Sequence, residues 1–276
     1  MTKIHVLRTG SVWIKAAQVR ARGTGLTRLY NGLFDKAWSD ELPIYAFLIE
    51  HEDGRILVDT GATAAATRPG YYQRWHPYYW VGMRLDVKPE DEIGPALRAA
   101  GFDPADVGTI VLTHMHTDHA GGLAAFEGAR ILVGAKEWAS STGFMGRLGG
   151  YPNHRWPTWL KPELLTFPEP SGDLLAASLP LTRDGTVRVM PAPGHTLGHL
   201  AVSVEIDGVL FLLAGDSTYL QQTLLEGVPD GVGADPALEL VTQRAIRDLA
   251  ARRPLVYLTS HDPDGPRRLA QREAMV

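Results

Sequence analysis

The chain has 276 residues, of which 45% are hydrophobic and 21% charged, and this composition is ordinary for a packed globular protein. It contains no cysteine, which excludes disulfides, thiolate nucleophiles and zinc sites built on cysteine. The formal net charge of −4 and the scattered basic residues argue against a nucleic-acid partner.

Short β-like runs predict strands throughout the chain. In order, these are residues 44–50, 56–59, 109–113, 130–133, 187–190, 201–206, 209–214 and 255–260. Helical patterns are predicted at 92–100, around 121–126, and at 236–252, where an apolar face is formed by Leu238, Val241, Ala245 and Leu249. Strands and helices therefore alternate irregularly in a strand-rich chain.

Two tight turns indicate how the strands pair. Glu52-Asp53-Gly54 and Asp207-Gly208 each join two predicted strands, one pair in each half of the chain. This arrangement favours an α/β sandwich of two similar sheets over one parallel sheet. We expect a single domain over residues 1–276, with long surface excursions near 67–89 and 143–183, where Pro, Gly and aromatic residues are frequent.

A cluster of metal-binding side chains follows the strand predicted at 109–113. His114, His116, Asp118 and His119 fall within six residues. Side chains at positions i and i+2 of an extended segment point the same way, so His114 and His116 can grip one ion. A turn can then bring Asp118 and His119 round to a second ion. The spacing therefore suits two adjacent metals.

Three further ligand-type residues follow later predicted strands. His195 lies in the segment Pro193–His199, Asp216 in Leu213–Ser217, and His261 in Leu258–Asp262. Each ends an apolar strand or opens a Gly-rich loop, which is where sites are built on α/β frames.

These segments resemble the metallo-β-lactamase superfamily, whose pattern is His-x-His-x-Asp-His followed by a histidine, a bridging aspartate and a last histidine. The resemblance implies an α/β fold in which two mixed β-sheets, flanked by helices, form an αββα sandwich. Asp59, in Leu57–Gly61, matches the Asp-Thr-Gly turn that the superfamily places beneath its metal site. The match therefore runs from about residue 44 through His261.

The resemblance also implies seven metal ligands. The first ion would be held by His114, His116 and His195, and the second by Asp118, His119 and His261. Asp216 would bridge the two ions. Two divalent ions offset by two carboxylates and one hydroxide leave a net charge of about +1, which attracts a polarised carbonyl or an anion. Zinc is the expected metal, and iron, manganese and cobalt also suit these ligands.

The superfamily includes β-lactamases, glyoxalase II thioesterases, nucleases, flavodiiron oxidoreductases and lactonases, so the fold alone does not fix the substrate. Three of these activities fit this chain poorly. β-Lactamases lack a bridging aspartate, nucleases carry basic surfaces that this mildly acidic chain lacks, and flavodiiron proteins need an attached flavin domain. Tyr219, three residues after Asp216, is similar to the Asp-x-x-Tyr arrangement of N-acyl-homoserine lactone hydrolases. Its hydroxyl would donate to the developing oxyanion. The alternative is a tyrosine that packs its ring and bonds a backbone carbonyl.

We therefore predict a dinuclear metal-dependent hydrolase that opens lactone rings, above all N-acyl-homoserine lactones, through attack of a metal-bridging hydroxide on the carbonyl. Asp118 is expected to pass a proton to the leaving alkoxide. The aromatic segments 71–80 and 156–159 are expected to contact the acyl tail. The alternatives are a glyoxalase II-like thioesterase and a phosphotriesterase or other ester hydrolase on the same fold.

Some residues stay open at this point. Met115 and Thr117 stand where quorum-quenching lactonases commonly carry a bulky apolar and an aromatic residue, which leaves the substrate in question. His199 is either a hydrogen-bond partner of a ligand or an ordinary buried histidine, and Asp262 either orients His261 or is solvated. The other histidines are interpreted as surface or loop residues: His5, His51, His76 and His154.

The expected partner is a small-molecule acyl lactone, and the aromatic loops are also compatible with a homodimer. No segment approaches the roughly 20 apolar residues of a membrane helix, so membrane insertion is not expected. Residues 1–8 lack the continuous apolar stretch of a signal peptide, so a cytoplasmic location is expected.

Overall fold

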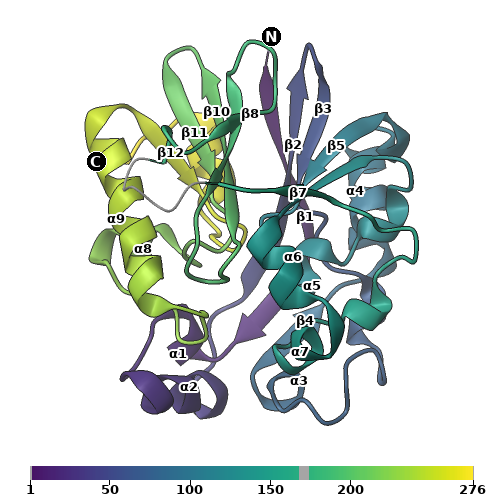
Figure 1. The fold of residues 1–276 in the computed structure, drawn as a ribbon, viewed down its shortest axis with the longest axis vertical. Helices are drawn as coiled ribbons and strands as arrows, with labels where there is room; N and C mark the ends of the chain where they lie inside the picture. The colour runs from purple at the N-terminus through teal and green to yellow at the C-terminus, as the bar shows by residue number, and fades with distance from the viewer. Residues whose placement is uncertain (1, 168–173, 276) are drawn as a thin grey trace.

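The computed structural model describes residues 2–167 and 174–275 (Figure 1). Its strands are β1 (Lys3–Ile14), β2 (Leu42–His51), β3 (Gly54–Val58), β4 (Met83–Asp86), β5 (Val107–Val111), β6 (Arg130–Gly134), β7 (Glu163–Leu165), β8 (Leu179–Pro180), β9 (Val187–Pro191), β10 (Leu200–Ile206), β11 (Val209–Leu213) and β12 (Leu255–Leu258). Its α-helices are α1 (Ala16–Val19), α2 (Gly25–Phe34), α3 (Tyr78–Val81), α4 (Ile93–Ala99), α5 (Thr117–Ala120), α6 (Ala135–Ser141), α7 (Gly143–Leu148), α8 (Gln221–Glu226), α9 (Pro236–Arg252) and α10 (Gly265–Gln271). Short 3₁₀ helices lie at Ala64–Thr67, Pro89–Asp91, Pro104–Asp106, Leu123–Ala125 and Asn153–Arg155.

Within these residues, the strands form two mixed sheets. The first has the order β4-β1-β2-β3-β5-β6-β7, and the second has the order β12-β11-β10-β9-β8. In the first sheet, β1, β2, β3 and β4 pair antiparallel, whereas β3, β5, β6 and β7 pair parallel. In the second, only β11 and β12 pair parallel. Both predicted hairpins are present, as β2–β3 and β10–β11.

Alternation along the strands builds the layers of the molecule. In β2, Phe47 and Ile49 face the second sheet, whereas Ala46 and Leu48 face the helices α4 and α5. In β11, the side chains likewise alternate between the core that separates the sheets and the core beneath α8 and α9. Figure 1 shows the sheets side by side, with helices on both outer faces. The predicted αββα sandwich is therefore confirmed.

Strand β1 has no counterpart among the predicted strands because its pairing is interrupted. Gly10 adopts a φ of 123°, and the register with β2 shifts between Arg8 and Ser11. Such a bulge breaks the period of two on which strand prediction depends. The short strands β4, β7 and β8 were likewise not predicted.

The two excursions contain local structure of their own. Segment 67–89 includes α3 and β4, and segment 143–183 includes α7, β7 and β8. Residues 168–173 of the second segment lie outside the described residues. The helix predicted around 121–126 begins earlier, as α5, and only a 3₁₀ turn occupies 123–125.

Helix α9 has the predicted bounds, but its predicted apolar face is partly wrong. Ala245 and Leu249 are buried, together with Ile246, whereas Val241 is 43% exposed. Polar residues complete the buried side of the helix, and Thr242 donates from Oγ1 to the carbonyl of Pro193 at 2.6 Å. Because these buried side chains are polar, a prediction based on hydropathy alone leaves them out and includes Val241 instead. No helix among the described residues is long and apolar enough to cross a membrane.

The two sides of α9 provide a matched test of this packing. Ile246→Ala removes a fully buried side chain and is expected to lower the free energy of unfolding by about 2–5 kcal/mol. Val241→Ala, on the exposed side, is expected to change it by no more than about 0.5 kcal/mol. Urea denaturation of both variants measures the difference, and equal losses would contradict the assignment of the buried face.

Candidate metal centre

The seven predicted ligand residues meet at one end of the sandwich. They follow β5, β9, β11 and β12, whose carboxyl ends lie on the same side of the two sheets. Their ligand atoms form three overlapping groups, each with all atoms within 4.8 Å of one another: His114, His116 and His195; His114, His119 and Asp216; Asp118, His119 and His261. The spacing in sequence therefore corresponds to proximity in space.

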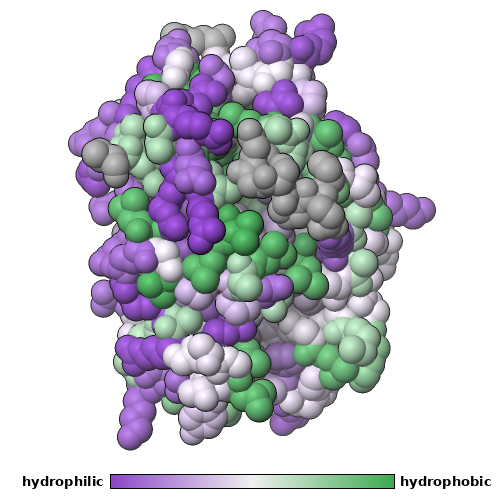
Figure 2. Space-filling view, turned by 60° about the vertical axis from the view of Figure 1, so that its left-hand side comes forward, coloured by the Kyte–Doolittle hydropathy of each residue, from purple (hydrophilic) through white to green (hydrophobic). Residues whose placement is uncertain are grey.

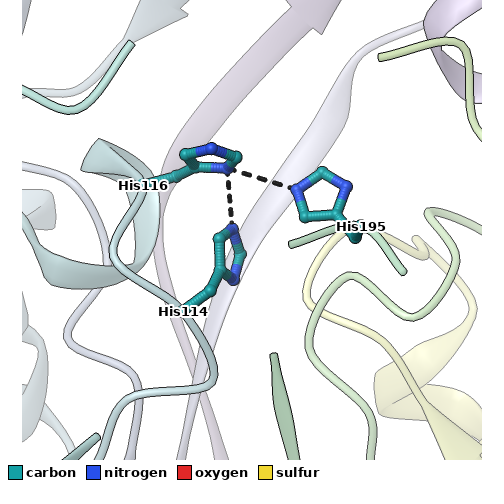
Figure 3. A group of neighbouring side chains, drawn as sticks. All are labelled: His114, His116 and His195. Atoms are coloured by element: carbon teal, nitrogen blue, oxygen red, sulfur yellow. Dashed lines mark hydrogen bonds between the residues drawn. The ribbon is translucent and has the colours of Figure 1, made fainter. Parts of the chain in front are cut away.

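The first group is a triangle of ring nitrogens (Figure 3). The Nδ1 atom of His116 lies 2.9 Å from Nε2 of His114 and 3.2 Å from Nε2 of His195. Met115, between the first two histidines, points the opposite way into the core beneath the helices. This is the alternation expected of an extended segment, although β5 itself ends at Val111.

Asp216 lies between the first group and the third. Its Oδ2 atom is 3.7 Å from Nε2 of His195, and its Oδ1 atom is 3.4 Å from Nε2 of His119 and 3.3 Å from Nε2 of His261. Asp118 approaches from the open side, with Oδ2 3.5 Å from Nε2 of His261. Asp216 therefore directs Oδ2 at the first group and Oδ1 at the third.

Hydrogen bonds fix the protonated nitrogen of three of these histidines. His195 donates from Nδ1 to Asp230 at 2.6 Å, His119 donates from Nδ1 to Asp59 at 2.8 Å, and His261 donates from Nδ1 to the carbonyl of Pro43 at 2.8 Å. Ionised carboxylates and carbonyls only accept hydrogen bonds, so in each neutral ring Nε2 keeps its lone pair. Those lone pairs all face the centre.

His114 is oriented through Thr113. The backbone N–H of Thr113 donates to Oδ1 of Asp59 at 2.7 Å, and its hydroxyl donates to Oδ2 at 2.8 Å. The hydroxyl oxygen is then free to accept from Nδ1 of His114 at 3.1 Å. Nε2 of His114 therefore also presents a lone pair, and one aspartate orients a histidine of the first group and a histidine of the third.

The donor atoms fit divalent metal ions. Nε2 of His119, Nε2 of His261 and Oδ1 of Asp216 are buried and have no hydrogen-bond partner among the described residues. Leaving buried polar atoms without partners costs about 1–3 kcal/mol each, which a cation between them would offset. Imidazole and carboxylate are ligands for zinc and for several other divalent transition metals.

The pKa values divide the histidines of the site into two sets. Burial and the neighbouring histidines lower the pKa of His114 well below its usual value, and burial lowers that of His116 to about 3. Burial also disfavours charge on His195, but Asp230 and Asp216 outweigh it and raise the pKa to about 9. Asp216 likewise outweighs burial at His119 and His261, whose pKa values are raised. Protons and metal ions therefore compete for these atoms.

Asp59 occupies a strained turn directly beneath the centre. Its φ is 62°, an unusual value for a residue with a side chain, and Gly61 follows with a φ of 65°. A Cβ atom at Gly61 would lie 2.1 Å from Oγ1 of Thr9, so only glycine fits there. Thr60 donates from Oγ1 to the carbonyl of His119 at 2.9 Å. These contacts explain the Asp-Thr-Gly sequence.

Asp230 is a site residue that sequence analysis missed. It is 2% exposed, orients His195, and accepts at Oδ1 from the backbone N–H of Val232 at 2.8 Å. Arg28 of α2 fixes the same loop by donating to the carbonyls of Asp230 at 3.2 Å and Gly233 at 2.9 Å. The sequence Pro-Asp-Gly is typical of a surface turn. The only available signal was that a ligand histidine needs an acceptor for its second N–H.

Glu137 was also missed. It is fully buried, and its Oε1 atom accepts from the backbone N–H of Met115 at 2.9 Å, which fixes the segment between His114 and His116. Burial raises the pKa of this carboxyl.

His199 orients Asp216, which lies between the first group and the third. Its Nε2 atom accepts from the backbone N–H of Asp216 at 3.0 Å, so it is a hydrogen-bond partner of the site and lies outside the three groups. Gly215 has a φ of 51°, and a Cβ atom there would lie 2.8 Å from that same nitrogen. Close packing of His199 therefore also explains the glycine before Asp216.

The other doubtful residues have separate partners. Asp262 is buried and does not bond to His261. Its Oδ2 atom lies 2.7 Å from Nη2 of Arg268 and accepts from the backbone N–H of Gln221 at 2.8 Å. The side chain of His51 is only 2% exposed and lies 3.1 Å from Asp184, so its interpretation as a surface residue is wrong. His5 contacts Glu50 at 2.7 Å.

A cavity of about 310 Å³ opens beside the metal-binding groups. Its polar wall includes Asp118, Asp216 and His195, and its apolar wall includes Val12, Ile14, Leu29, Leu33, Met83, Leu148 and Val232. Tyr219 also lines the cavity, with its ring centroid 5.9 Å from that of His195 and 5.5 Å from that of His261. A site of this size and polarity suits a small ligand with an apolar part.

Only one of the two aromatic segments reaches this cavity. Tyr78 and Tyr79 line it, together with His76. Trp156 and Trp159 instead pack on the core outside the first sheet, where Trp156 stacks on Trp138 with ring centroids 5.5 Å apart. Segment 156–159 therefore does not line the cavity, contrary to the expectation, whereas residues of α2 and of the end of α7 do.

Comparison with known proteins agrees with this geometry. Residues 39–261 match the family model of the metallo-beta-lactamase superfamily. The chain belongs to this superfamily. Among superfamily relatives, the N-acyl homoserine lactonase AttM of Azorhizobium caulinodans is 29% identical over 276 residues, which cover 95% of this chain and 94% of AttM.

Solved structures of the superfamily share the fold. An N-acyl homoserine lactone hydrolase, with N-hexanoyl-L-homoserine bound at its catalytic metal centre, has a TM-score of 0.74 at 22% identity and covers 96% of this chain and 95% of its own. The dizinc quorum-quenching lactonase AidC has a TM-score of 0.66 at 17% identity and covers 95% of this chain and 88% of its own.

The carboxylates behind the histidines provide a paired prediction for this superfamily member. Asp230→Asn should lower the affinity for the metal ion at His195 by about 10- to 100-fold, because the charged acceptor that orients His195 is lost. Asp59→Asn should lower the affinity for the other metal ion, because it disturbs His119. It should also lower the affinity for the ion at His195 to a smaller extent, because Asp59 orients His114 through Thr113. Chelator competition on the zinc-loaded variants resolves the two affinities.

Asp35→Asn is the matched control, since Asp35 accepts from the backbone N–H of Ala17, away from the metal-binding groups. It is expected to leave both affinities unchanged. Parent-like affinities in Asp230→Asn would contradict the role of this carboxylate.

Proposed function

We propose that this protein is a metal-dependent hydrolase that opens the ring of N-acyl homoserine lactones. The observation that carries the proposal is Tyr219, which lines the cavity between His195 and His261 and stands three residues after Asp216. The similarity to the N-acyl homoserine lactonase AttM, which extends over nearly the whole length of both chains, supports the same substrate class.

The proposed centre holds two divalent ions. His114, His116 and His195 would hold the first and Asp118, His119 and His261 the second, with Asp216 between them. The unpartnered buried lone pairs and the two directions of the Asp216 carboxylate support this division. When bound, such a pair polarises a carbonyl and lowers the pKa of a water molecule, so that hydroxide is available near neutral pH. Zinc is the metal we propose.

Tyr219 would stabilise the charge that develops on the carbonyl oxygen. The residue is buried, and burial raises the pKa of its phenol well above the usual value. Its hydroxyl therefore keeps its proton at any pH at which the enzyme would work. A neutral donor held at the cavity wall supplies a fixed dipole towards an oxyanion.

Asp118 would pass a proton to the leaving alkoxide. Unlike Asp216, it is partly exposed, with 21% of its side chain accessible, and it lines the cavity. A carboxylate that contacts both the polar wall and the open space can accept a proton from the attacking water and deliver it to the opened ring.

The apolar wall would hold the acyl tail. Leu29 and Leu33 of α2, Leu148 of α7 and the rings of Tyr78 and Tyr79 face the space next to the ligand groups. A lactone ring at the metal-binding groups would therefore extend its tail along α2. A thioesterase of glyoxalase II type and a phosphotriesterase are the alternatives that the test must separate.

The test compares Tyr219→Phe with the parent on a panel of acyl-homoserine lactones, S-lactoylglutathione and a phosphotriester. If the phenol donates mainly in the transition state, kcat/KM for lactones should fall by about 10- to 100-fold, or about 1.5–3 kcal/mol, at unchanged metal content. Lactones should be the best substrates of the parent.

Tyr257→Phe is the matched control, because its hydroxyl bonds Oγ1 of Thr218 at 2.9 Å and it does not line the cavity. It should keep parent-like turnover. Preferred hydrolysis of the thioester, with no effect of Tyr219→Phe, would replace the lactonase assignment by the glyoxalase II-like one.

A further inference from the structure

One end of the molecule exposes large apolar side chains around the mouth of the cavity. On α2, Leu26 is 85% exposed, and Tyr30 and Phe34 are also exposed. On α7, Phe144 is 69% and Met145 72% exposed. Trp75 and Trp80, in and beside α3, are exposed as well. All three helices lie at the lower end of the ribbon, α2 on the left and α3 and α7 on the right (Figure 1).

This apolar surface is continuous with the cavity. The inner sides of the same helices supply Leu29, Leu33, Tyr78, Tyr79 and Leu148 to the cavity wall. The cavity therefore opens between helices whose outer sides are also apolar. Figure 2 shows hydrophobic side chains interspersed with hydrophilic ones at this lower end.

The same end concentrates positive charge. Segments 15–36, 68–84 and 143–155 contain ten Lys and Arg residues and a single acid, Asp35, although the whole chain has a net charge of −4. Eight of the ten are exposed: Arg20, Arg22, Lys36, Arg68, Arg74, Arg84, Arg147 and Arg155. Basic residues that look scattered along the sequence are thus gathered by the fold.

Several of these cations have no carboxylate to neutralise them. Arg20 pairs with Glu226 and Arg22 with Asp35. Within the described part of the chain, the other six exposed cations form no ion pair: Lys36, Arg68, Arg74, Arg84, Arg147 and Arg155. An exposed surface that combines bulky apolar groups with unpaired arginines is the pattern of a peripheral lipid-binding surface.

We propose that this end, formed by α2, α3 and α7 with their flanking arginines, docks on an anionic lipid surface. The apolar side chains would enter the boundary between headgroups and acyl chains, and the arginines would contact the lipid phosphates. A second copy fits less well, because a two-fold interface would bring two sets of unpaired cations together. Docking needs no membrane-spanning helix.

Docking would turn the mouth of the cavity towards the lipid. An amphiphilic substrate dissolved in the lipid would then reach the metal-binding groups without crossing water. The docking itself involves no substrate, so it stands or fails separately from the proposed lactonase activity.

The test is co-sedimentation of the metal-loaded protein with vesicles of phosphatidylcholine alone and of phosphatidylcholine mixed with phosphatidylglycerol. The protein is expected to bind the anionic vesicles at low salt and to dissociate as salt is raised. A blue shift of tryptophan fluorescence on binding should report entry of Trp75 and Trp80 into lipid.

Two variants remove the two components separately. The charge reversal Arg68→Glu with Arg74→Glu should lower the partition coefficient by about tenfold or more, since each cation near an anionic surface contributes about fivefold. Leu26→Gln with Phe144→Gln should weaken binding even at low salt. Arg98→Glu with Val241→Gln, exposed residues outside the proposed surface, is the control and should bind like the parent.

Three results would overturn the proposal. One is failure of the parent protein to bind anionic vesicles. Another is equal loss of binding in the control variant. The third is a dimer in size-exclusion chromatography that Leu26→Gln with Phe144→Gln dissociates while vesicle binding is absent, which would assign this surface to a second copy of the chain.

Discussion

The carboxylate of Asp59 is the contact on which the metal centre most depends. It accepts three hydrogen bonds, two from Thr113 and one from His119, in a turn that itself requires a positive φ. Through Thr113 it also sets the ring of His114. A single buried anion, held between the first sheet and α5, thus decides which nitrogens of two proposed ligands face the cavity.

Three other proposed ligands are oriented from other layers of the molecule. Asp230 orients His195 from the loop before α9, and the carbonyl of Pro43 orients His261 from β2. His199 fixes the backbone of Asp216 from the second sheet. Because these supports come from both sheets, the ligand set forms only when the sandwich is closed, and its geometry is prepared before a metal arrives.

The periodic strands indicated a sandwich of two similar sheets, and the dense His/Asp motif carried the resemblance to the superfamily. That resemblance implied the αββα arrangement and the grouping of the seven proposed ligands. Asp230 and Glu137 were missed, since their roles depend on contacts across the fold. Val241 was misplaced because buried polar residues mask the inner face of α9. Trp156 and Trp159 were assigned to the substrate because an aromatic residue has the same sequence appearance in a core and at a cavity. The cluster of basic residues around α2, α3 and α7 could not be predicted from the sequence, because its members come from three distant segments.

The central claim is that hydrogen bonds behind the rings direct chosen histidine nitrogens at two metal ions. Nuclear magnetic resonance of the zinc-loaded protein with nitrogen-15 histidine tests it most directly, because it reports which nitrogen of each ring carries hydrogen and which binds metal. The account predicts metal at Nε2 of His114, His119, His195 and His261, metal at Nδ1 of His116, and saturation at about two ions per chain. Saturation at one ion, coordination by His199, or His116 bound through Nε2 would contradict it.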